Sequence, residues 1–299
     1  MAAIDATLVK ALRDKTGAGV IACRNALVET LGDFDAAIDR LRAEEASKAA
    51  QKADRVAAEG LVALCVDGTR AAIVELNTET DFVARTAAFQ EAAASLARSA
   101  LEVAGDRDAL LDAPSPDDNG RVSDLVVRLA ARTGEHVNLR RSAFVSAGAG
   151  VVASYTHSAV TSGVGRIGVL VALDSQGPTD AVLGLGRAIA MHIAASSPLW
   201  ISQADIPADV MVEKRRALTE QAQSTGKGPA IVEKMVEGRM RRFRDETVLA
   251  LQPFALNPDQ RVGQVIEESG MAVAVKAFVR FRLAEGVSVS ASPNEMRRP

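Results

Sequence analysis

The pattern of apolar and polar positions predicts three short helices in about the first 46 residues. Gly17 and Gly32 are placed to end helices, because glycine adopts the positive φ of a helix C-terminus at little steric cost. A second helix is expected over residues 20–28, and Asp33 is placed to cap a third. The apolar stripes of the first and third helices are Ile4, Leu8 and Leu12, and Phe34, Ile38 and Leu41. Such a bundle has a thin core and needs to dock on another surface.

The turn between the first two helices, TGAGVI at residues 16–21, places Val20 and Ile21 directly after two glycines. One interpretation is a corner between helices in which both side chains join the core. The other is an apolar contact for a partner protein. The sequence leaves both open.

Residues 47–59, SKAAQKADRVAAE, are predicted to form a charged helical connector. Lys48, Lys52 and Arg55 are spaced four and three apart, which places them on one face of a helix. A solvated face is the favoured interpretation of such a charge run.

From Gly60 onward the chain repeats the order strand, turn, strand, helix, then helix, strand. In the first copy these are strands at 60–63 and 73–76, a helix after Thr80, a helix at 122–131 and a strand at 136–145. In the second they are strands at 150–153 and 167–173, helices at 179–195 and 262–268, and a strand at 272–283. Only a short turn joins the first strand pair, so the strands are expected to be antiparallel. The pattern predicts an α+β fold with two similar subdomains.

The second copy contains an insertion over residues 208–247, which predicts two helical arms around the breaker sequence at 224–229. The expected apolar seam of this hairpin is Ile231, Met235, Met240 and Phe243. Residues 106–120 are expected to form a polar loop, and the C-terminal tail to be disordered. The predicted domains are 1–54, 55–148, 149–205 with 249–284, the hairpin 206–248, and the tail 285–299.

The stretch at residues 77–89, NTETDFVARTAAF, lies where a predicted strand gives way to a helix. Thr78 or Thr80 can cap that helix, and Asp81 falls in its first turn. Phe82 has no such local role, because a large ring beside a carboxylate on a turn is poorly placed for burial in its own core. It is better placed for insertion into another molecule. The apolar face of the following helix is expected to contain Phe89, Ala93 and Leu96.

Composition narrows the classes of function. The net charge of −3 argues against general nucleic-acid binding, which requires a basic surface. The sequence contains no run of roughly 20 apolar residues, and its start lacks the pattern of an export signal. Cys23 and Cys65 have no metal-type spacing and are expected to be free thiols. We expect a cytoplasmic protein with no membrane segment.

The chemical motifs of common enzymes are missing from the sequence. There is no P-loop, no dinucleotide-binding GxGxxG and no GxSxG, and the histidines are too dispersed for a metal motif. His192 is expected to be a core residue, and His157 either a plain loop residue or a contact. An enzyme with Asp81 as base and His157 as its partner would lack any oxyanion stabiliser or cofactor cradle. No cofactor, metal or catalytic residue is predicted, and a protein–protein adaptor is the stronger rival.

Several sequence blocks resemble bacterial elongation factor Ts, the guanine-nucleotide exchange factor of elongation factor Tu. The resemblance extends from Ile4 to about residue 285 and includes LVKALRDKTGAGVIACRNAL, NTETDFVAR, HVNLRRSAF, GRIGVLV, AIAMHIAA and VEKMVEGRM. It implies an N-terminal three-helix domain similar to ubiquitin-associated domains, followed by the core of two subdomains with its inserted hairpin. It also implies a translation elongation factor whose partner is elongation factor Tu, with no direct nucleic-acid contact and no catalytic chemistry of its own.

The resemblance also implies roles for particular residues. The segment that disturbs the Mg²⁺ site of the partner would be Thr80, Asp81, Phe82 and Val83, with Phe82 as a wedge. Residues expected to contact the partner are Val20, Ile21, Arg24, Lys52, Thr133, Gly134, His157 and Ala255. Thr133 and Ala255 are less bulky than the apolar residues common there in relatives, so their contacts are expected to be weaker. The hairpin is a candidate for self-association, and an adaptor with a helical head remains the alternative function.

Overall fold

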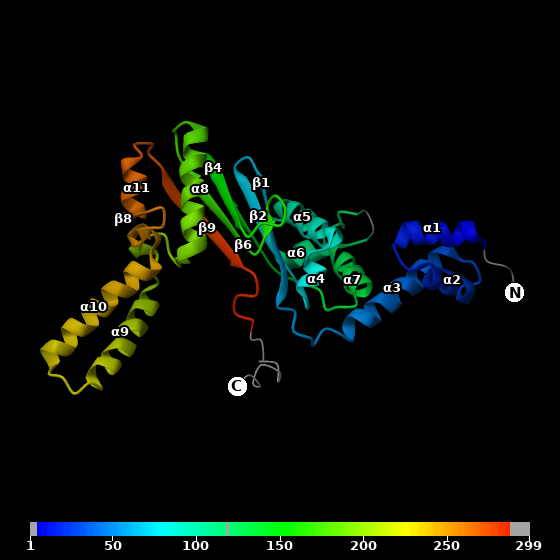
Figure 1. The fold of residues 1–299 in the computed structure, drawn as a ribbon, viewed down its shortest axis with the longest axis horizontal. Coiled ribbons are helices and arrows are strands. Elements are labelled where there is room, and N and C mark those ends of the chain that lie inside the picture. The colour runs from blue at the N-terminus through cyan, green and yellow to red at the C-terminus, as the bar shows by residue number, and fades with distance from the viewer. Residues whose placement is uncertain (1–4, 118–119, 288–299) are drawn as a thin grey trace.

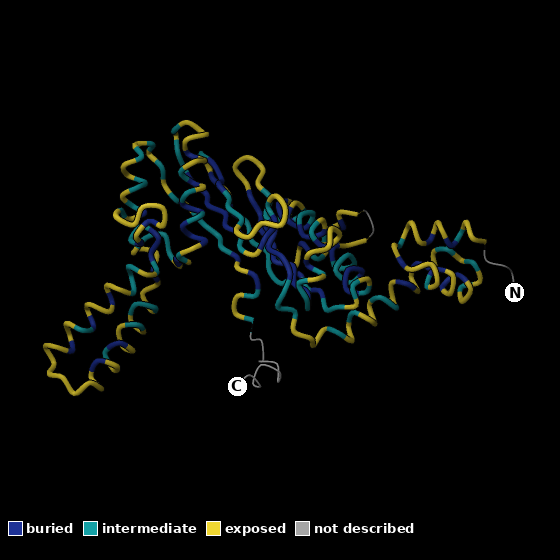
Figure 2. The backbone as a smooth tube through the Cα atoms, viewed as in Figure 1, coloured by how far each residue is buried: buried dark blue, intermediate teal, exposed yellow. Residues whose placement is uncertain are grey.

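The computed structural model describes residues 5–117 and 120–287, and it has the predicted α+β fold. The molecule is elongated, with a helical bundle at the N-terminal end, two sheets in the middle and a helical hairpin at the other end (Figure 1). Buried backbone is concentrated in the two sheets, whereas the bundle and the hairpin are largely exposed (Figure 2). The sheets therefore form the main core, and the helical ends extend from it.

The N-terminal bundle consists of α1 (Ala6–Thr16), α2 (Val20–Glu29) and α3 (Phe34–Ala50), as predicted. Gly17 has a φ of 72° and caps α1, and the Asp33 carboxylate accepts a hydrogen bond from the Ala36 amide at the start of α3. The stripe predicted for α1 is confirmed at Leu12, which is buried, and in part at Leu8, which is half-buried and packs against the core. The prediction missed Val9, which is also buried. Ile4 lies outside the described residues. The bundle core consists of Val9, Leu12, Ala18, Cys23, Ala26, Leu27, Ala37, Ile38 and Leu41.

The predicted helical connector is wrong beyond Ala50, where α3 ends and a run of turns begins. Lys48 pairs with Glu44 within α3, at 3.6 Å, whereas Arg55 pairs with Glu79 at 3.4 Å. The backbone carbonyl of Arg55 also accepts a hydrogen bond from a side chain elsewhere in the chain. These contacts hold Arg55 beside the turn that contains Glu79, away from the helix that contains Lys48, so Lys48 and Arg55 do not share one face.

The first sheet has the strand order β3-β2-β1-β5 and is antiparallel throughout. Its strands are β1 (Glu59–Asp67), β2 (Arg70–Thr78), β3 (Asn138–Ser146) and β5 (Val164–Gly165). One face is covered by α4 (Asp81–Ala84), α5 (Ala87–Glu102), α6 (Arg107–Asp112) and α7 (Val122–Thr133). Two of these elements differ from the prediction: α6 forms within the expected polar loop, because Asp106 caps it, and β5 comes from the second half of the chain.

The second sheet has the order β4-β6-β9 and is also antiparallel. Its strands are β4 (Gly150–His157), β6 (Ile167–Asp174) and β9 (Ala274–Arg282), and α8 (Thr179–Ser196) and α11 (Val262–Glu268) pack on it. A small two-stranded sheet of β7 (Pro253–Phe254) and β8 (Asn257–Arg261) lies beside these helices. In sequence it comes between the 3₁₀ helix η2 (Leu249–Leu251) and α11. Another 3₁₀ helix, η1 (Gln203–Asp205), precedes the inserted hairpin. The predicted elements of the second copy are confirmed.

The two sheets pack face to face, which the sequence did not predict. Alternate residues of the strands point to a shared core between them, made of Val62, Ala71, Ile73, Val145, Ala147, Val152, Leu170, Ala172, Phe281 and Leu283. At Gly168 a Cβ atom would lie 2.8 Å from side-chain carbons of both Ile73 and Val62, so any larger residue would force these side chains to move. The fold is thus four layers: helices, sheet, sheet, helices.

A buried carboxylate joins the two sheets at one end of this shared core. The Glu75 side chain on β2 is fully buried and accepts hydrogen bonds from Arg140 at 3.0 Å and Arg141 at 2.5 Å, both on β3. It also accepts one from the backbone amide of Ala284, just after β9, at 2.9 Å. The Arg141 guanidinium stacks 4.1 Å from the ring centroid of Phe281 on β9. The cluster therefore fixes the second sheet against the first.

The inserted hairpin consists of α9 (Ala208–Gln223) and α10 (Pro229–Thr247). Its seam is Leu218, Ala222, Val232, Val236 and Met240, with Met211 and Met235 packed at the edge. The predicted seam was wrong at Ile231, which is 51% exposed. The sequence of α10 allows two apolar stripes that are offset by one residue. The stripe of Val232, Val236 and Met240 is the one that packs against α9.

In the described residues no helix is long and apolar enough to cross a bilayer. Within the same residues, no three His, Cys, Asp or Glu side chains converge as a metal site would require. Cys23 is buried and Cys65 is half-buried, and both are free thiols. Burial raises the pKa of the Cys65 thiol. The tail predicted to be disordered lies outside the described residues from residue 288 onward.

Candidate partner-binding site

The segment TDFV forms the start of α4, a helix of four residues between β2 and α5. Ala84 is buried and Val83 packs partly against the core of the first subdomain. Phe82, between Asp81 and Val83, is 79% exposed. The prediction that this ring points away from its own core is therefore confirmed. The neighbours of Phe82 anchor the turn, and the ring projects from it.

The expected capping role of Thr78 and Thr80 is wrong. Thr86 caps α5, because its hydroxyl accepts a hydrogen bond from the Phe89 amide at 3.4 Å. Thr80 occupies the N-cap position of α4, but its side chain makes no capping bond. Both hydroxyls donate instead to the carboxylate of Glu135, which follows α7 in the chain.

The Glu135 carboxylate accepts four hydrogen bonds from three consecutive residues before α4. The donors are the hydroxyl of Thr78 at 2.6 Å, the amide of Glu79 at 3.1 Å, and the amide and hydroxyl of Thr80 at 3.0 and 2.5 Å. Burial alone would raise the pKa of Glu135. The bonds from Thr78, Thr80 and the Glu79 amide outweigh that effect, so the pKa lies below the ordinary glutamate value.

A second set of contacts joins Glu79, in the turn before α4, to His136 and Arg55. The Glu79 carboxylate accepts a hydrogen bond from the His136 amide at 2.6 Å and pairs with Arg55 at 3.4 Å. The His136 ring donates from Nδ1 to the Arg55 carbonyl at 2.7 Å, since a carbonyl can only accept. The end of the connector, the turn before α4 and the turn after α7 are thus held in one network.

Asp81 forms a short ion pair with Arg85 one turn later, at 2.8 Å. The two side chains are 40% and 74% exposed. An exposed pair of this kind contributes about 0–1 kcal/mol, so docking of a partner could separate it at little cost. Arg85 therefore orients the Asp81 carboxylate but leaves it accessible to a partner.

Two predicted contact residues, Thr133 and Gly134, lie beside this network at the end of α7. Gly134 is exposed and has a φ of 75°, and its amide bonds to the Ala130 carbonyl. This left-handed residue turns the chain so that Glu135 meets the TDFV turn. Lys52 is half-buried in the connector, three residues before Arg55. The structure therefore places Thr133 and Gly134 beside the network that holds the TDFV segment, and Lys52 in the turns that lead to Arg55.

His157 lies at the exposed end of β4, where its Nδ1 is 3.1 Å from the hydroxyl of Tyr155. The His157 carbonyl accepts a hydrogen bond from the amide of Arg166, whose guanidinium bonds to Glu59 at 3.0 Å. Glu59 pairs in register with Thr78, the strand residue that leads to the TDFV turn. His157 and TDFV are thus connected through the ends of neighbouring strands.

Ala255 is the remaining predicted contact outside the N-terminal bundle. It lines the same surface cavity, of about 490 Å³, as His157. The Ala255 amide donates to Nδ1 of His192 at 3.1 Å, and Nε2 of that ring lies 2.8 Å from Oε1 of Gln252. These partners fix a neutral imidazole that carries its proton on Nε2. Burial lowers the pKa of His192, and the bond to Gln252 only partly opposes this. The expectation that His192 is a satisfied core residue is confirmed.

The N-terminal contact residues are exposed on α2, at the far end of the molecule from the hairpin (Figure 1). Val20 is 51% exposed and Ile21 is 77% exposed, so the interpretation that places them in the core is wrong. Arg24 is exposed one turn later. Val28 and Leu31, also exposed, add to the apolar surface of the bundle. The structure does not bring these residues to the TDFV turn.

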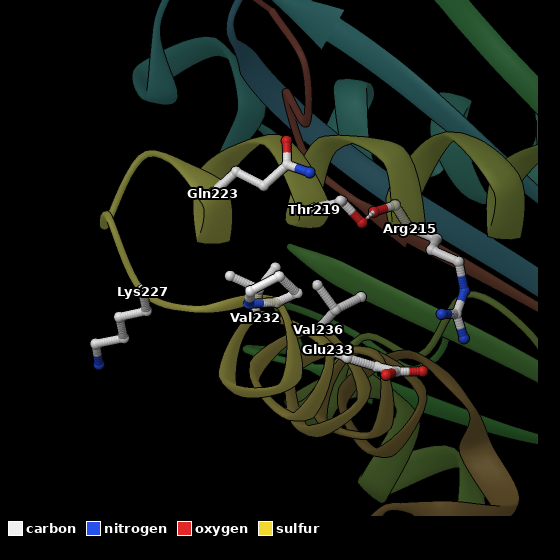
Figure 3. Close-up of a pocket in the computed structure, with 8 residues that line it drawn as sticks. Arg215, Thr219, Gln223, Lys227, Val232, Glu233 and Val236 are labelled. Carbon is white, nitrogen blue, oxygen red and sulfur yellow. Dashed lines mark hydrogen bonds between the residues drawn. The ribbon is translucent and has the colours of Figure 1, made fainter.

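The hairpin has a groove between its two arms, with a volume of about 320 Å³ (Figure 3). Val232 and Val236 line its floor, and Arg215 and Lys227 lie at opposite ends. The Thr219 hydroxyl donates a hydrogen bond to the Arg215 carbonyl at 2.9 Å. The groove lies far from TDFV and His157 and contains none of the predicted contact residues.

The contact list drawn from the sequence did not include Glu135, Glu79 or Arg85. Arg85 could have been found, because a basic residue four positions after Asp81 in a helix is placed for an ion pair. Glu135 lies 57 residues from Thr78 in sequence, and no local pattern reports such a contact.

Comparison with known proteins identifies the family. The family model described as Elongation factor TS matches residues 79–285, which include the TDFV turn, Glu135, His157 and Ala255. The elongation factor Ts of Hyphomonas neptunium is 50% identical over 293 residues, covering 97% of this chain and 95% of that protein. That of Caulobacter sp. (strain K31) is 50% identical with 96% and 94% coverage, and that of Paramagnetospirillum magneticum 45% identical with 98% and 95%. The chain belongs to the elongation factor Ts family, the translation elongation factors of protein biosynthesis whose name these relatives bear.

Proposed function

We propose that the protein is a guanine-nucleotide exchange factor for elongation factor Tu. It binds the GDP complex of that GTPase, disturbs its Mg²⁺ and phosphate site, and promotes release of GDP so that GTP can bind. The turn made by Thr80, Asp81, Phe82 and Val83 performs the disturbance. Mg²⁺ demands near-ideal octahedral geometry, so a small shift of its surroundings weakens the site.

The observation that carries this proposal is the exposure of Phe82 on a turn that is itself anchored. An aromatic ring left 79% in water contributes little to the stability of its own fold. Because Val83 and Ala84 pack inward, the ring is held at a defined place on the surface. This is the arrangement expected of a wedge that enters an apolar slot in a partner.

Docking would use the predicted contacts over a long surface. Val20, Ile21 and Arg24 would engage the partner from the N-terminal bundle, and His157 and Ala255 from the second subdomain. Lys52, Thr133 and Gly134 would surround the TDFV turn. The exposure of Val20 and Ile21 supports the first of these contacts.

No covalent step is required in this mechanism. If the factor weakens nucleotide binding, the nucleotide weakens binding of the factor by the same free energy. The factor therefore accelerates exchange without changing its final equilibrium. The protein would act as a catalyst of dissociation, with no catalytic residue or cofactor of its own.

The test is a stopped-flow measurement of fluorescently labelled GDP leaving elongation factor Tu, with and without the protein. We expect a large increase in the release rate, and a much smaller increase with Phe82→Ala at saturating concentration. Arg98→Ala, which changes an exposed residue of α5, is the matched control and should release GDP like the natural protein. An unchanged release rate with the natural protein would refute the proposal.

The second candidate is an adaptor that binds a partner through the bundle without exchanging its nucleotide. The exposed apolar residues Val20, Ile21, Val28 and Leu31 favour it, because they suffice for a docking patch. An adaptor would bind elongation factor Tu and leave the GDP release rate unchanged. Self-association through the hairpin, where Ile231 and Val212 are exposed, is a separate proposal that sedimentation analysis would test.

A further inference from the structure

The TDFV turn cannot hold its own conformation. The helix α4 has four residues, which is a single turn, and an isolated turn of helix is unstable in water. The Thr80 side chain makes no capping bond to α4. Ala84 and Val83 fix the C-terminal side of the turn by packing, but the side that precedes Phe82 needs another anchor.

Glu135 occupies the place where such an anchor is needed. Its two oxygens accept bonds from Thr78, Glu79 and Thr80, the three residues before Asp81. Two of these donors are backbone amides, so the carboxylate fixes the path of the chain as well as the side chains. The lowered pKa of Glu135 agrees with a carboxylate that stays ionised among these donors.

We propose that Glu135 is the positioning residue of the exchange segment: it holds the turn so that Phe82 and Asp81 meet the partner in the productive orientation. This inference rests on the proposed exchange function. Glu135 itself need not touch the partner or the nucleotide. It affects exchange by orienting Phe82 and Asp81. A residue that only touched the partner would instead change the affinity of binding.

A purely structural role would have a different signature. If Glu135 only stabilised the fold, its loss would reduce the folded fraction and leave the properties of each folded molecule unchanged. If it positions the turn, folded molecules should dock with nearly normal affinity, because Val20, Ile21, His157 and Ala255 are untouched. Their limiting rate of GDP release should fall. The separation of these two quantities distinguishes the two roles.

The experiment compares Glu135→Ala with Glu135→Gln and with a control, Asp106→Ala. Gln keeps an oxygen that can accept the three bonds made to Oε2, and its amide can donate to the Thr80 hydroxyl. Asp106 also accepts two backbone amide bonds, but it caps α6 and has no contact with the turn. The full chain is titrated against elongation factor Tu with labelled GDP, and folding is checked by urea unfolding.

We expect Glu135→Ala to lower the limiting release rate by about tenfold or more, since small misplacements of an acting group can cost up to about a hundredfold. The half-saturating concentration should change by less than about threefold, and Gln should restore most of the rate. Asp106→Ala should leave both quantities unchanged. Hydrogen exchange should show faster exchange at the Glu79 and Thr80 amides in the Ala variant alone.

The decisive measurement is a double-mutant cycle with Phe82→Ala. Because Glu135 acts through the ring and through Asp81, the loss in the double variant should be clearly smaller than the sum of the two single losses. Additive losses, or a normal limiting rate in folded Glu135→Ala, would overturn the inference while leaving the exchange function intact. Failure of the natural protein to stimulate release would instead refute the proposed function itself.

Discussion

Two phenylalanines seven positions apart show how differently single residues of this chain are used. Phe89 is 1% exposed in the core of the first subdomain, whereas Phe82 is 79% exposed. Phe89→Ala should lower the free energy of unfolding by about 3–5 kcal/mol, because it leaves a cavity. Phe82→Ala should change it by no more than about 0.5 kcal/mol. Urea unfolding followed by circular dichroism measures both, and a large loss with Phe82→Ala would mean that the ring supports its own fold.

Glu135 predicts a response to acid. Its pKa is lower in the folded protein than in the unfolded chain, so its contribution to stability is complete above the ordinary value of about 4.3 and is lost as the pH falls through the lower folded value. The same junction contains Glu79, which pairs with Arg55, and His136, whose amide donates to Glu79.

Glu135→Gln removes this titration, so its unfolding free energy should fall less steeply below pH 5 than that of the natural protein. Urea titrations at a series of pH values would show the difference. Parallel curves for the two proteins would show that Glu135 does not contribute to acid sensitivity.

At the scale of single residues, the sequence predicted the features that depend on neighbouring residues in the chain. The exposure of Phe82 followed from its place on a turn beside Asp81, and the burial of His192 from the apolar helix around it. The use of Thr78 and Thr80 did not follow, because a hydroxyl next to a helix start is equally suited to capping that helix or to bonding elsewhere. Glu135, distant in sequence, decided between them.

At the scale of elements, the helical hairpin shows how a helix can be predicted correctly and oriented wrongly. Both Ile231 and Val232 begin a series at spacing four, and only contact with α9 selects the second. In α1 the predicted stripe missed Val9, which is buried beside Leu12, while Leu8 packs at the edge of the core. Periodicity gives the existence of such helices, but their rotation is set by packing.

The hairpin seam can be tested with two substitutions on the same helix. Met240 is 1% exposed in the seam, and Met240→Ala should destabilise the protein by about 2–5 kcal/mol. Ile231→Ala, at a position that is 51% exposed, should change stability by at most about 0.5 kcal/mol. Thermal unfolding followed by circular dichroism compares them, and equal losses would contradict the observed rotation of α10.

At the scale of the whole molecule, the Glu75 cluster is a buried polar link between the two sheets. Replacing this buried carboxylate by an amide removes the negative charge that pairs with Arg140 and Arg141, and their bonds to Glu285 and to the Arg282 carbonyl replace it only in part. Glu75→Gln should therefore lower the free energy of unfolding by about 3–5 kcal/mol. Glu246→Gln, in an exposed pair with Arg242, is the control and should leave the free energy of unfolding nearly unchanged. A comparable loss in both variants in urea would mean that the cluster is no stronger than a surface pair.

Much of the overall fold was visible in the sequence. The repeated order of strands and helices predicted two similar antiparallel units, and the breaker sequence predicted the hairpin. The contact between the two sheets was not predicted, because the near-continuous apolar run of β2 indicates burial on both faces without showing what covers each face. The connector was mistaken for a helix because its composition is helical, whereas Arg55 is held by Glu79 and His136 from distant segments.

The short strand β5 has a consequence for how the chain can be divided. Val164 and Gly165 come after the boundary between the repeats, yet they pair with Val62 and Ala63 at the margin of the first sheet. A fragment ending near residue 148 would lose that cover and expose unpaired backbone along β1, a surface on which copies of the fragment can stack. We therefore expect a fragment that ends near residue 148 to aggregate, and the two repeats to stay soluble only when they are expressed as one chain.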